Sequence, residues 1–113
     1  MINLACKNIT VQELITCAFN INKTEYLIIS QLLKKQNCSS ESLSNKLGKD
    51  LTTIQKALKT LVEKELVIRK QINLEGGGYK FIYQSISKEE IKNKIENNLN
   101  NFQEKVLLRL ETF

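Results

Sequence analysis

The sequence predicts a mainly helical α+β fold in which short helices precede a β-hairpin and one long helix follows it. Three observations support this prediction. Capping residues recur before apolar stretches with helical spacing, β-branched and aromatic residues flank three consecutive glycines, and proline is absent. A chain of 113 residues has room for one small core and a long appended helix.

Two helices are expected near the N-terminus, and each begins at a polar N-cap with a glutamate three residues later. Thr10 caps the first, which we expect to end near Phe19, and Asn22 caps the second, which we expect to run to about Gln36. An apolar residue precedes each cap and another lies four positions after it, as in a hydrophobic staple.

Two further helices follow, joined through a single glycine. Ser39 caps a short third helix, and Gly48 can adopt the left-handed conformation at its end. Asp50 then caps a fourth helix over about residues 50 to 64, whose apolar positions have amphipathic spacing. The expected buried stripe of this helix consists of Ile54, Ala57, Leu58, Leu61 and Val62.

Residues 66 to 86 are rich in β-branched and aromatic side chains on both sides of Gly76, Gly77 and Gly78, which predicts a β-hairpin. Three glycines also occur in phosphate-binding loops. The Lys and Ser or Thr of that motif do not follow here, and both flanks have strand character. We therefore interpret the glycines as the hairpin tip.

The last helix is expected to begin at Ser87, which forms a capping box with Glu90, and to reach Phe113. At about 1.5 Å per residue it would be about 39 Å long, which is longer than the small domain that precedes it. Its apolar residues recur in steps of three and four, interrupted at Arg109, as in a helix that pairs with another helix. The expected dimerisation residues are Ile95, Leu99, Phe102, Val106, Leu110 and Phe113. An unpaired stripe of this length would favour aggregation, so self-association is expected.

The charge is concentrated in one third of the chain. Residues 46 to 80 contribute +4 of the net charge of +5, because eight basic residues there oppose four acidic ones. A basic surface confined to one segment favours a polyanionic partner, with a merely solvated charged face as the alternative.

Composition argues against several other functions. The chain has no histidine, and its three cysteines, Cys6, Cys17 and Cys38, are widely spaced, so we expect no disulfide framework, metal site or cofactor. No nucleophile and base pair is visible, which argues against an enzyme. No apolar run is long enough to span a membrane and no signal peptide is apparent, so we expect a cytoplasmic protein without a membrane partner. For Cys38, packing against Leu43 is favoured over redox sensing at the helix N-terminus.

Two short helices joined through Gly48 and followed by a hairpin have the order of a winged helix-turn-helix, whose second helix enters the DNA major groove. Leu51 would then meet a thymine methyl group. The candidate DNA-binding residues of this helix are Thr52, Thr53, Gln55, Lys56 and Lys59. Those of the hairpin, or wing, are Arg69, Lys70 and Lys80, with Gln71 and Asn73 beside them. Glu75 near the tip would repel phosphate, so a wing that only covers the core is the alternative.

The segment SSESLSNKLGKDLTTIQKALKTLVEKELVIR (residues 39 to 69), followed by GGGYKFIYQSISKEEI, resembles the MarR-like and TrmB-like winged-helix regulators common in archaea. The resemblance extends over about residues 20 to 95. It implies a DNA-binding homodimer, often held together by terminal helices, that regulates transcription. Two features depart from the pattern. Glu65 stands where such sequences usually have glycine, and the chain is too short for the effector domain of full-length TrmB-like proteins, so we expect no sugar sensing.

The sequence therefore predicts two units: a DNA-binding domain over residues 1 to 86, including the N-terminal helix, and a coiled-coil-like dimerisation helix over residues 87 to 113. The predicted function is sequence-specific binding of double-stranded DNA by a homodimer that regulates transcription. A winged-helix module that binds proteins and no specific DNA is the alternative, because a fold alone does not determine function.

Overall fold

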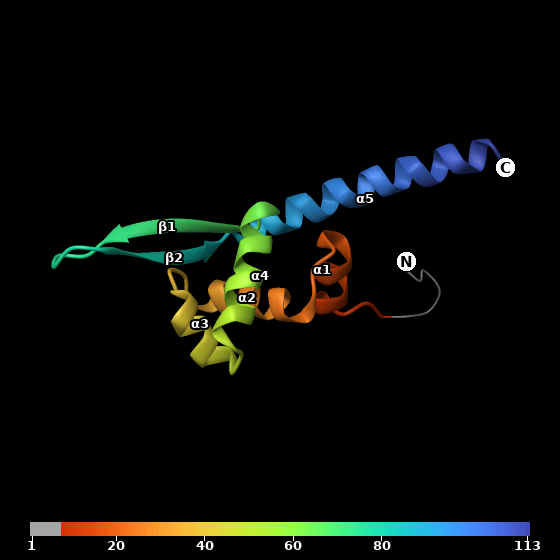
Figure 1. The fold of residues 1–113 in the computed structure, drawn as a ribbon. Coiled ribbons are helices and arrows are strands. Elements are labelled where there is room, and N and C mark those ends of the chain that lie inside the picture. The colour runs from red at the N-terminus through yellow and green to blue at the C-terminus, as the bar shows by residue number, and fades with distance from the viewer. Residues whose placement is uncertain (1–7) are drawn as a thin grey trace.

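The computed structural model describes residues 8 to 113, so Cys6 lies outside the described residues. Five helices and one antiparallel two-stranded sheet follow each other along this part of the chain (Figure 1). They are α1 (Val11–Phe19), α2 (Lys23–Lys34), α3 (Ser40–Leu47), α4 (Leu51–Glu63), β1 (Val67–Asn73), β2 (Tyr79–Ser85) and α5 (Lys88–Glu111). The predicted mainly helical fold with a hairpin and a long C-terminal helix is confirmed.

Every predicted helix start is confirmed by a hydrogen bond at its N-cap. In each case the cap side chain accepts from the backbone N–H three residues later. The five caps are Thr10, Asn22, Ser39, Asp50 and Ser87. Asn22 and Ser87 form complete capping boxes, because their glutamate partners also accept from the cap backbone. Local side-chain chemistry thus determines where the helices begin.

The predicted end of the second helix is wrong by two residues. Helix α2 ends at Lys34, because Lys35 is extended and the chain then pairs with β2. The backbone N–H of Cys38 donates to the carbonyl of Tyr83 at 3.1 Å, and the Tyr83 N–H donates back at 2.8 Å. Gln36, released from the helix, accepts from the Ser85 N–H through its side-chain oxygen at 2.9 Å. Tertiary pairing overrides the helical pattern here.

One hydrophobic core joins α2, α3, α4 and the start of the hairpin. Its largest fully buried side chains are Ile28, Ile29, Leu32, Leu43, Ile54, Leu58, Leu61 and Leu66. The predicted stripe of α4 is confirmed, with Val62 only partly buried. Cys38 is also buried, and its thiol donates to the carbonyl of Lys35 at 3.1 Å, which agrees with the packed role expected for it.

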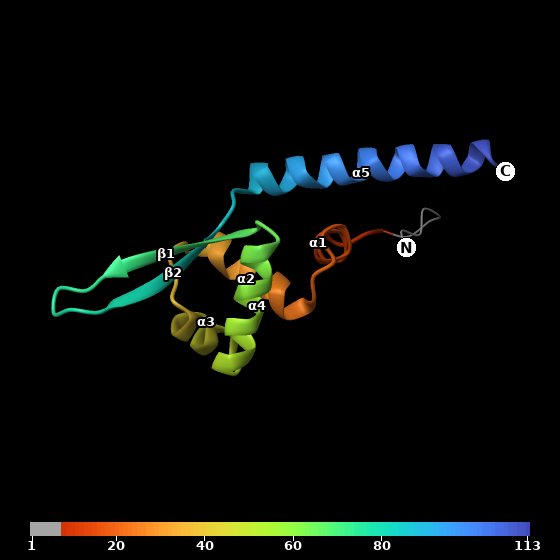
Figure 2. The same cartoon turned by 45° about the horizontal axis from the view of Figure 1, so that its top comes forward.

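The wing and α5 project from opposite ends of this core (Figures 1 and 2). The molecule is therefore elongated, with extents of 65 × 23 × 23 Å. At the start of α5, Ile91 is buried and Ile95 packs partly against the core. Every residue of the helix after Ile95 is exposed. The apolar side chains of α5 from Leu99 onward are therefore left uncovered within the described part of the chain.

Candidate nucleic-acid interface

The turn between α3 and α4 is held by hydrogen bonds that converge on Ser44. Gly48 is left-handed, with φ 62°, and its N–H donates to the Ser44 carbonyl. The Lys49 N–H donates to the same carbonyl at 3.2 Å, while the Ser44 hydroxyl donates to the Lys49 carbonyl at 2.5 Å. Asp50 then caps α4. These bonds fix the direction in which α4 leaves the turn.

All five candidate residues of α4 are exposed: Thr52, Thr53, Gln55, Lys56 and Lys59. The spacing of Thr52, Lys56 and Lys59 places them on one face of the helix. This face lies opposite the stripe that contains Ile54 and Leu58, which are 0% and 1% exposed. The structure therefore brings the predicted helix residues together on a free surface that begins directly after the turn.

The wing residues predicted as one group are divided between two faces of the hairpin. The register pairs Arg69 with Tyr83, Lys70 with Ile82, and Ile72 with Lys80. Directly opposite residues share a face, and successive residues alternate between faces. Arg69 therefore shares one face with the aromatic residues of β2, whereas Lys70 and Lys80 lie on the other.

Arg69 has an aromatic neighbour that the sequence analysis did not single out. Its guanidinium lies 4.3 Å from the centre of the Phe81 ring, and the edge of Tyr79 meets Phe81 with ring centres 5.4 Å apart. A cation above an aromatic face is stabilised by the ring quadrupole. Phe81 therefore holds the guanidinium against the hairpin. Aromatic residues at every second position of β2 were the available signal.

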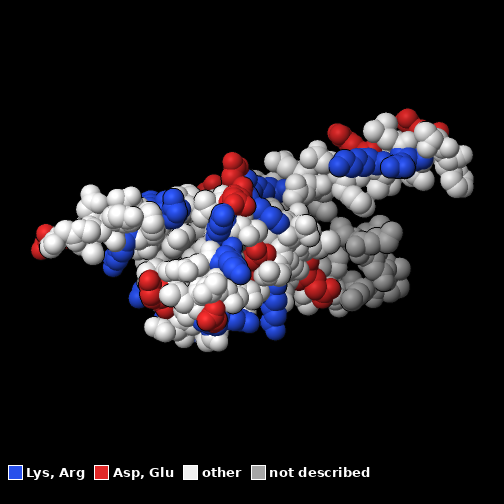
Figure 3. Space-filling model, in the orientation of Figure 1, with Lys and Arg blue, Asp and Glu red and all other residues white. Residues whose placement is uncertain are grey.

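Two more lysines lie beside the exposed face of α4. Lys46 is exposed in the last turn of α3, and Lys49 is partly exposed immediately before the α4 cap. Both belong to the basic segment of residues 46 to 80, but neither is among the predicted contacts. Figure 3 shows Lys and Arg side chains over α4 and along the wing, with acidic side chains among them and at the wing tip. The charge is thus spread over the surface that carries the candidate residues.

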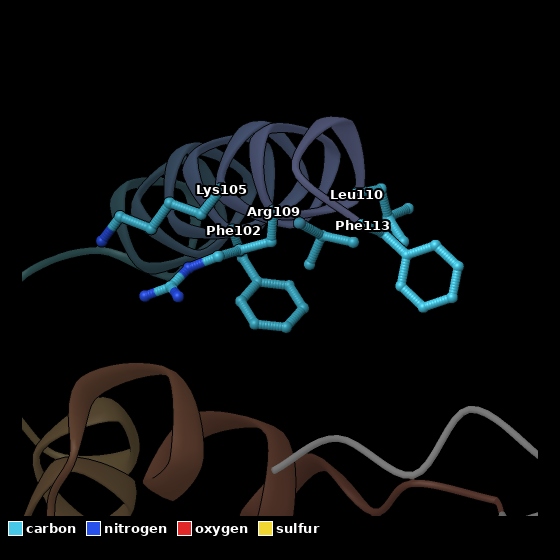
Figure 4. Close-up of a pocket in the computed structure, with 6 residues that line it drawn as sticks. Phe102, Lys105, Arg109, Leu110 and Phe113 are labelled. Atoms are coloured by element: carbon cyan, nitrogen blue, oxygen red, sulfur yellow. The ribbon is translucent and has the colours of Figure 1, made fainter.

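The expected dimerisation residues fall into two groups. Ile95 is partly buried against the core of its own chain, whereas the other five are exposed. Of these five, Phe102, Leu110 and Phe113 project from the same side of α5 (Figure 4). Together with Val106, Lys105 and Arg109 they line an open groove of about 530 Å³. The helix thus presents an apolar strip with a basic edge.

The described residues form neither a metal-binding cluster nor a helix that could cross a membrane. Between residues 8 and 113, no three His, Cys, Asp or Glu side chains gather closely enough to hold a metal ion. Over the same range, none of the helices combines the length and apolar character that a membrane crossing requires.

Comparison with known families identifies the chain. The family described as "Sugar-specific transcriptional regulator TrmB" matches residues 16 to 89, which include α2, both helices of the helix-turn-helix and the whole wing. The chain belongs to the TrmB family. It is therefore a member of a family of winged helix-turn-helix transcriptional regulators, not of enzymes.

Similar proteins occur in archaea and in bacteria. A possible transcriptional regulator from Methanosarcina mazei is 34% identical, with a TM-score of 0.87 over 100% of this chain and 96% of that one. An uncharacterized protein of Methanocaldococcus jannaschii is 29% identical over 85% of this chain and 73% of its own length. Staphylococcus aureus MarR shares the fold, with a TM-score of 0.57 at 21% identity over 88% of this chain and 65% of MarR. The TrmB-family chain thus has the winged-helix architecture that is also found in MarR.

Proposed function

We propose that this TrmB-family chain binds double-stranded DNA sequence-specifically as a homodimer and regulates transcription in the cytoplasm. The observation that carries the proposal is the free face of α4. It presents Thr52, Gln55, Lys56 and Lys59 to solvent directly after a rigid turn, within the segment that holds +4 of the net charge. A helix with these properties fits the major groove, where base edges carry the sequence code.

The residues of α4 have different proposed roles. Gln55 suits adenine, whose N6 and N7 it can pair with, and Lys56 suits the O6 and N7 acceptors of guanine. Lys59 and Thr52 would bind phosphate oxygens and fix the register of the helix on DNA. Leu51, partly buried at the start of the helix, suits a thymine methyl group. The helix has no arginine, so we expect no bidentate arginine contact with guanine from α4.

The two faces of the wing suit the two phosphate strands beside a groove. Arg69 would approach one strand and Lys70 and Lys80 the other, since they lie on opposite faces of the hairpin. The tip between β1 and β2 contains Gly76, Gly77 and Gly78, whose missing side chains permit close approach to DNA. Glu75 in the same tip opposes phosphate, so we propose that the strands, rather than the tip, supply the contacts.

The dimer is proposed to form through α5, with residues 1 to 86 as the DNA-binding unit and residues 87 to 113 as the dimerisation unit. The exposed apolar strip from Leu99 to Phe113 supports this, because a second copy of the helix would cover it. A two-fold dimer would present two copies of α4. We therefore expect half-sites separated by about 10 base pairs or a multiple of that distance.

The test begins with selection of bound duplexes from a random DNA pool, followed by fluorescence anisotropy on a recovered duplex at increasing salt. Affinity should fall steeply as salt rises, because lysines that neutralise phosphates release counterions. Lys56→Ala should weaken binding about tenfold or more. The matched control is Lys92→Ala, an exposed lysine of α5, which should leave affinity unchanged.

Salt-independent affinity would contradict DNA binding through the basic surface. Equal affinity of the Lys56→Ala and wild-type proteins would contradict the role of α4. Failure of the selection to enrich any sequence, together with retained binding to a protein partner, would favour the interaction-module alternative.

A further inference from the structure

The C-terminal end of α1 is held by side chains from two distant parts of the chain. The Lys64 ammonium donates to the carbonyl of Phe19 at 3.0 Å and to that of Asn20 at 2.5 Å. The side-chain amide of Asn98 donates to the carbonyl of Ala18 at 3.0 Å. Three consecutive carbonyls are therefore bound by one residue that ends α4 and one residue in α5.

These carbonyls need partners because of the way α1 ends. Asn20 is left-handed, and its N–H donates to the Cys17 carbonyl, while the Ile21 N–H donates to the Thr16 carbonyl. This motif satisfies two of the last carbonyls of the helix and leaves those that follow without a helical donor. An ammonium at this position also interacts favourably with the negative end of the helix dipole.

Lys64 is held at the end of α4 and is unlike the lysines of its free face. It is the C-cap residue, and the next residue, Glu65, is left-handed with φ 61°. Hydrogen bonds from the Glu65 N–H to Val62 and from the Leu66 N–H to Leu61 complete this helix end. Lys64 is partly buried, whereas Lys56 and Lys59 are exposed. Its ammonium group therefore binds the end of α1 and does not belong to the exposed face of α4.

Asn98 lies near the point where α5 leaves the domain. Ile91 is buried, Ile95 is partly buried, and the residues that follow are exposed. In both views α5 passes beside α1 and then projects away (Figures 1 and 2). The bond from Asn98 to Ala18 is thus the outermost hydrogen bond recorded between α5 and the domain within the described residues. It joins α5 to the end of α1 just before the exposed half of the helix begins.

We propose that Lys64 and Asn98, with the carbonyls of Ala18, Phe19 and Asn20, form a joint that positions the recognition helix relative to the dimerisation helix. The inference rests on the proposed function, because it assigns this α1 joint a role in DNA reading by a dimer. If α5 pairs two copies, the joint sets the distance and angle between the two α4 helices. Lys64 and Asn98 are then positioning residues that do not touch DNA.

The test compares a duplex recovered by selection with the same duplex after one half-site has been scrambled. Lys64→Met keeps the length of the side chain and removes its donors, and Asn98→Ala removes the other donor. Each variant should bind the complete duplex about tenfold more weakly, because a misplaced second helix loses its half-site. Binding to the single half-site should stay within about twofold of wild type. Lys64→Arg, which still donates, should restore the preference for two half-sites.

A second readout needs no DNA. Spin labels at Lys59→Cys on α4 and Lys105→Cys on α5, in a Cys6→Ser and Cys17→Ser background, report the distance between the two helices. Dilution with unlabelled chain restricts the signal to pairs within one chain. The wild-type joint should give a narrow distance distribution, which Lys64→Met and Asn98→Ala should broaden. Asn98 is exposed, so its variant tests the joint even where Lys64→Met fails to fold.

Unchanged distances would overturn the inference, as would an equal loss of affinity for the complete and half-site duplexes, which would make Lys64 a DNA contact. A selection that recovers no duplex for the wild-type protein would contradict the proposed function instead. The distance distributions would then still decide whether the joint positions α4 relative to α5.

Discussion

Helix α4, in the domain body formed by α1 to α4 and the wing, and the distal half of α5 both carry apolar residues at helical spacing. The apolar residues of α4 are buried, whereas those of distal α5 are exposed. In α4, the apolar stripe is buried against α2, α3 and the base of the wing, and Leu61 is 0% exposed. In α5, Phe102 is 49% exposed and Phe113 is fully exposed. Both helices bring an apolar strip at helical spacing, yet only one finds a partner in its own chain.

This difference separates what the chain can do alone from what requires a second molecule. The body contains a closed core and a turn held by hydrogen bonds, which together position the exposed face of α4. The distal half of α5 adds nothing to that core. We propose that a second chain covers its apolar strip, so that α5 would pair two copies of the exposed face of α4.

The largest expected effect is in the core. Leu61→Ala should lower the free energy of unfolding by about 2 to 5 kcal/mol, since it leaves a cavity between packed helices. Urea unfolding followed by circular dichroism measures this. Leu108→Ala is the matched control, because Leu108 is 61% exposed and away from the apolar strip, so a change within about 0.5 kcal/mol is expected. Equal losses would contradict the division into a closed body and an open helix.

The next effect concerns association. Phe102→Asp should weaken the dimer about a hundredfold or more, because it buries a charge in the proposed helix pair. Leu108→Asp, on the opposite face of α5, should change the dimer constant only slightly. Sedimentation equilibrium over a range of concentrations measures both. A greater loss for Leu108→Asp would mean that a different face of α5 forms the interface.

A smaller effect is expected in the wing, on the face that carries Arg69 and Phe81. Phe81→Leu removes the ring beneath Arg69 and should weaken DNA binding several-fold, in line with a cation–π interaction of about 0.5 to 2 kcal/mol. In the Arg69→Ala background the same change should have little further effect, because the two residues act together. Additive losses in this double-mutant cycle would show that Phe81 does not act through Arg69.

The smallest effect is a gain of stability at the end of α4. Glu65 has φ 61°, a conformation that costs a side-chain-bearing residue about 1 kcal/mol, so Glu65→Gly should stabilise the domain by up to that amount. Glu65→Ala removes the same carboxylate and keeps the unfavourable backbone, so it should give no gain. Thermal unfolding of the three proteins measures this, and destabilisation by glycine would contradict the explanation.

The sequence predicted the parts of the structure that depend on neighbouring residues. Each N-cap is confirmed because the hydrogen bond that starts a helix joins residues three apart, as at Asn22 and Ser87. The left-handed Gly48 and the buried stripe of α4 are local in the same sense. The exposed position of the α4 candidates followed directly from that stripe.

The features that could not be predicted from the sequence depend on contacts between residues that are far apart in it. The helix expected to reach Gln36 ends at Lys34 because Cys38 pairs with Tyr83, which lies 45 residues later in the sequence. The division of Arg69 from Lys70 and Lys80 required the strand register. Lys64 was counted only as part of the basic segment, because nothing near it in sequence indicates the end of α1.

The most direct test of the central claim is the mass of the purified protein in solution, measured by sedimentation equilibrium. We expect a species of about 26 kDa, twice the chain mass of 13.0 kDa, that Phe102→Asp converts to the single-chain mass. A wild-type mass of 13.0 kDa at every concentration, with sequence-specific DNA binding intact, would contradict the claim that α5 pairs two recognition helices.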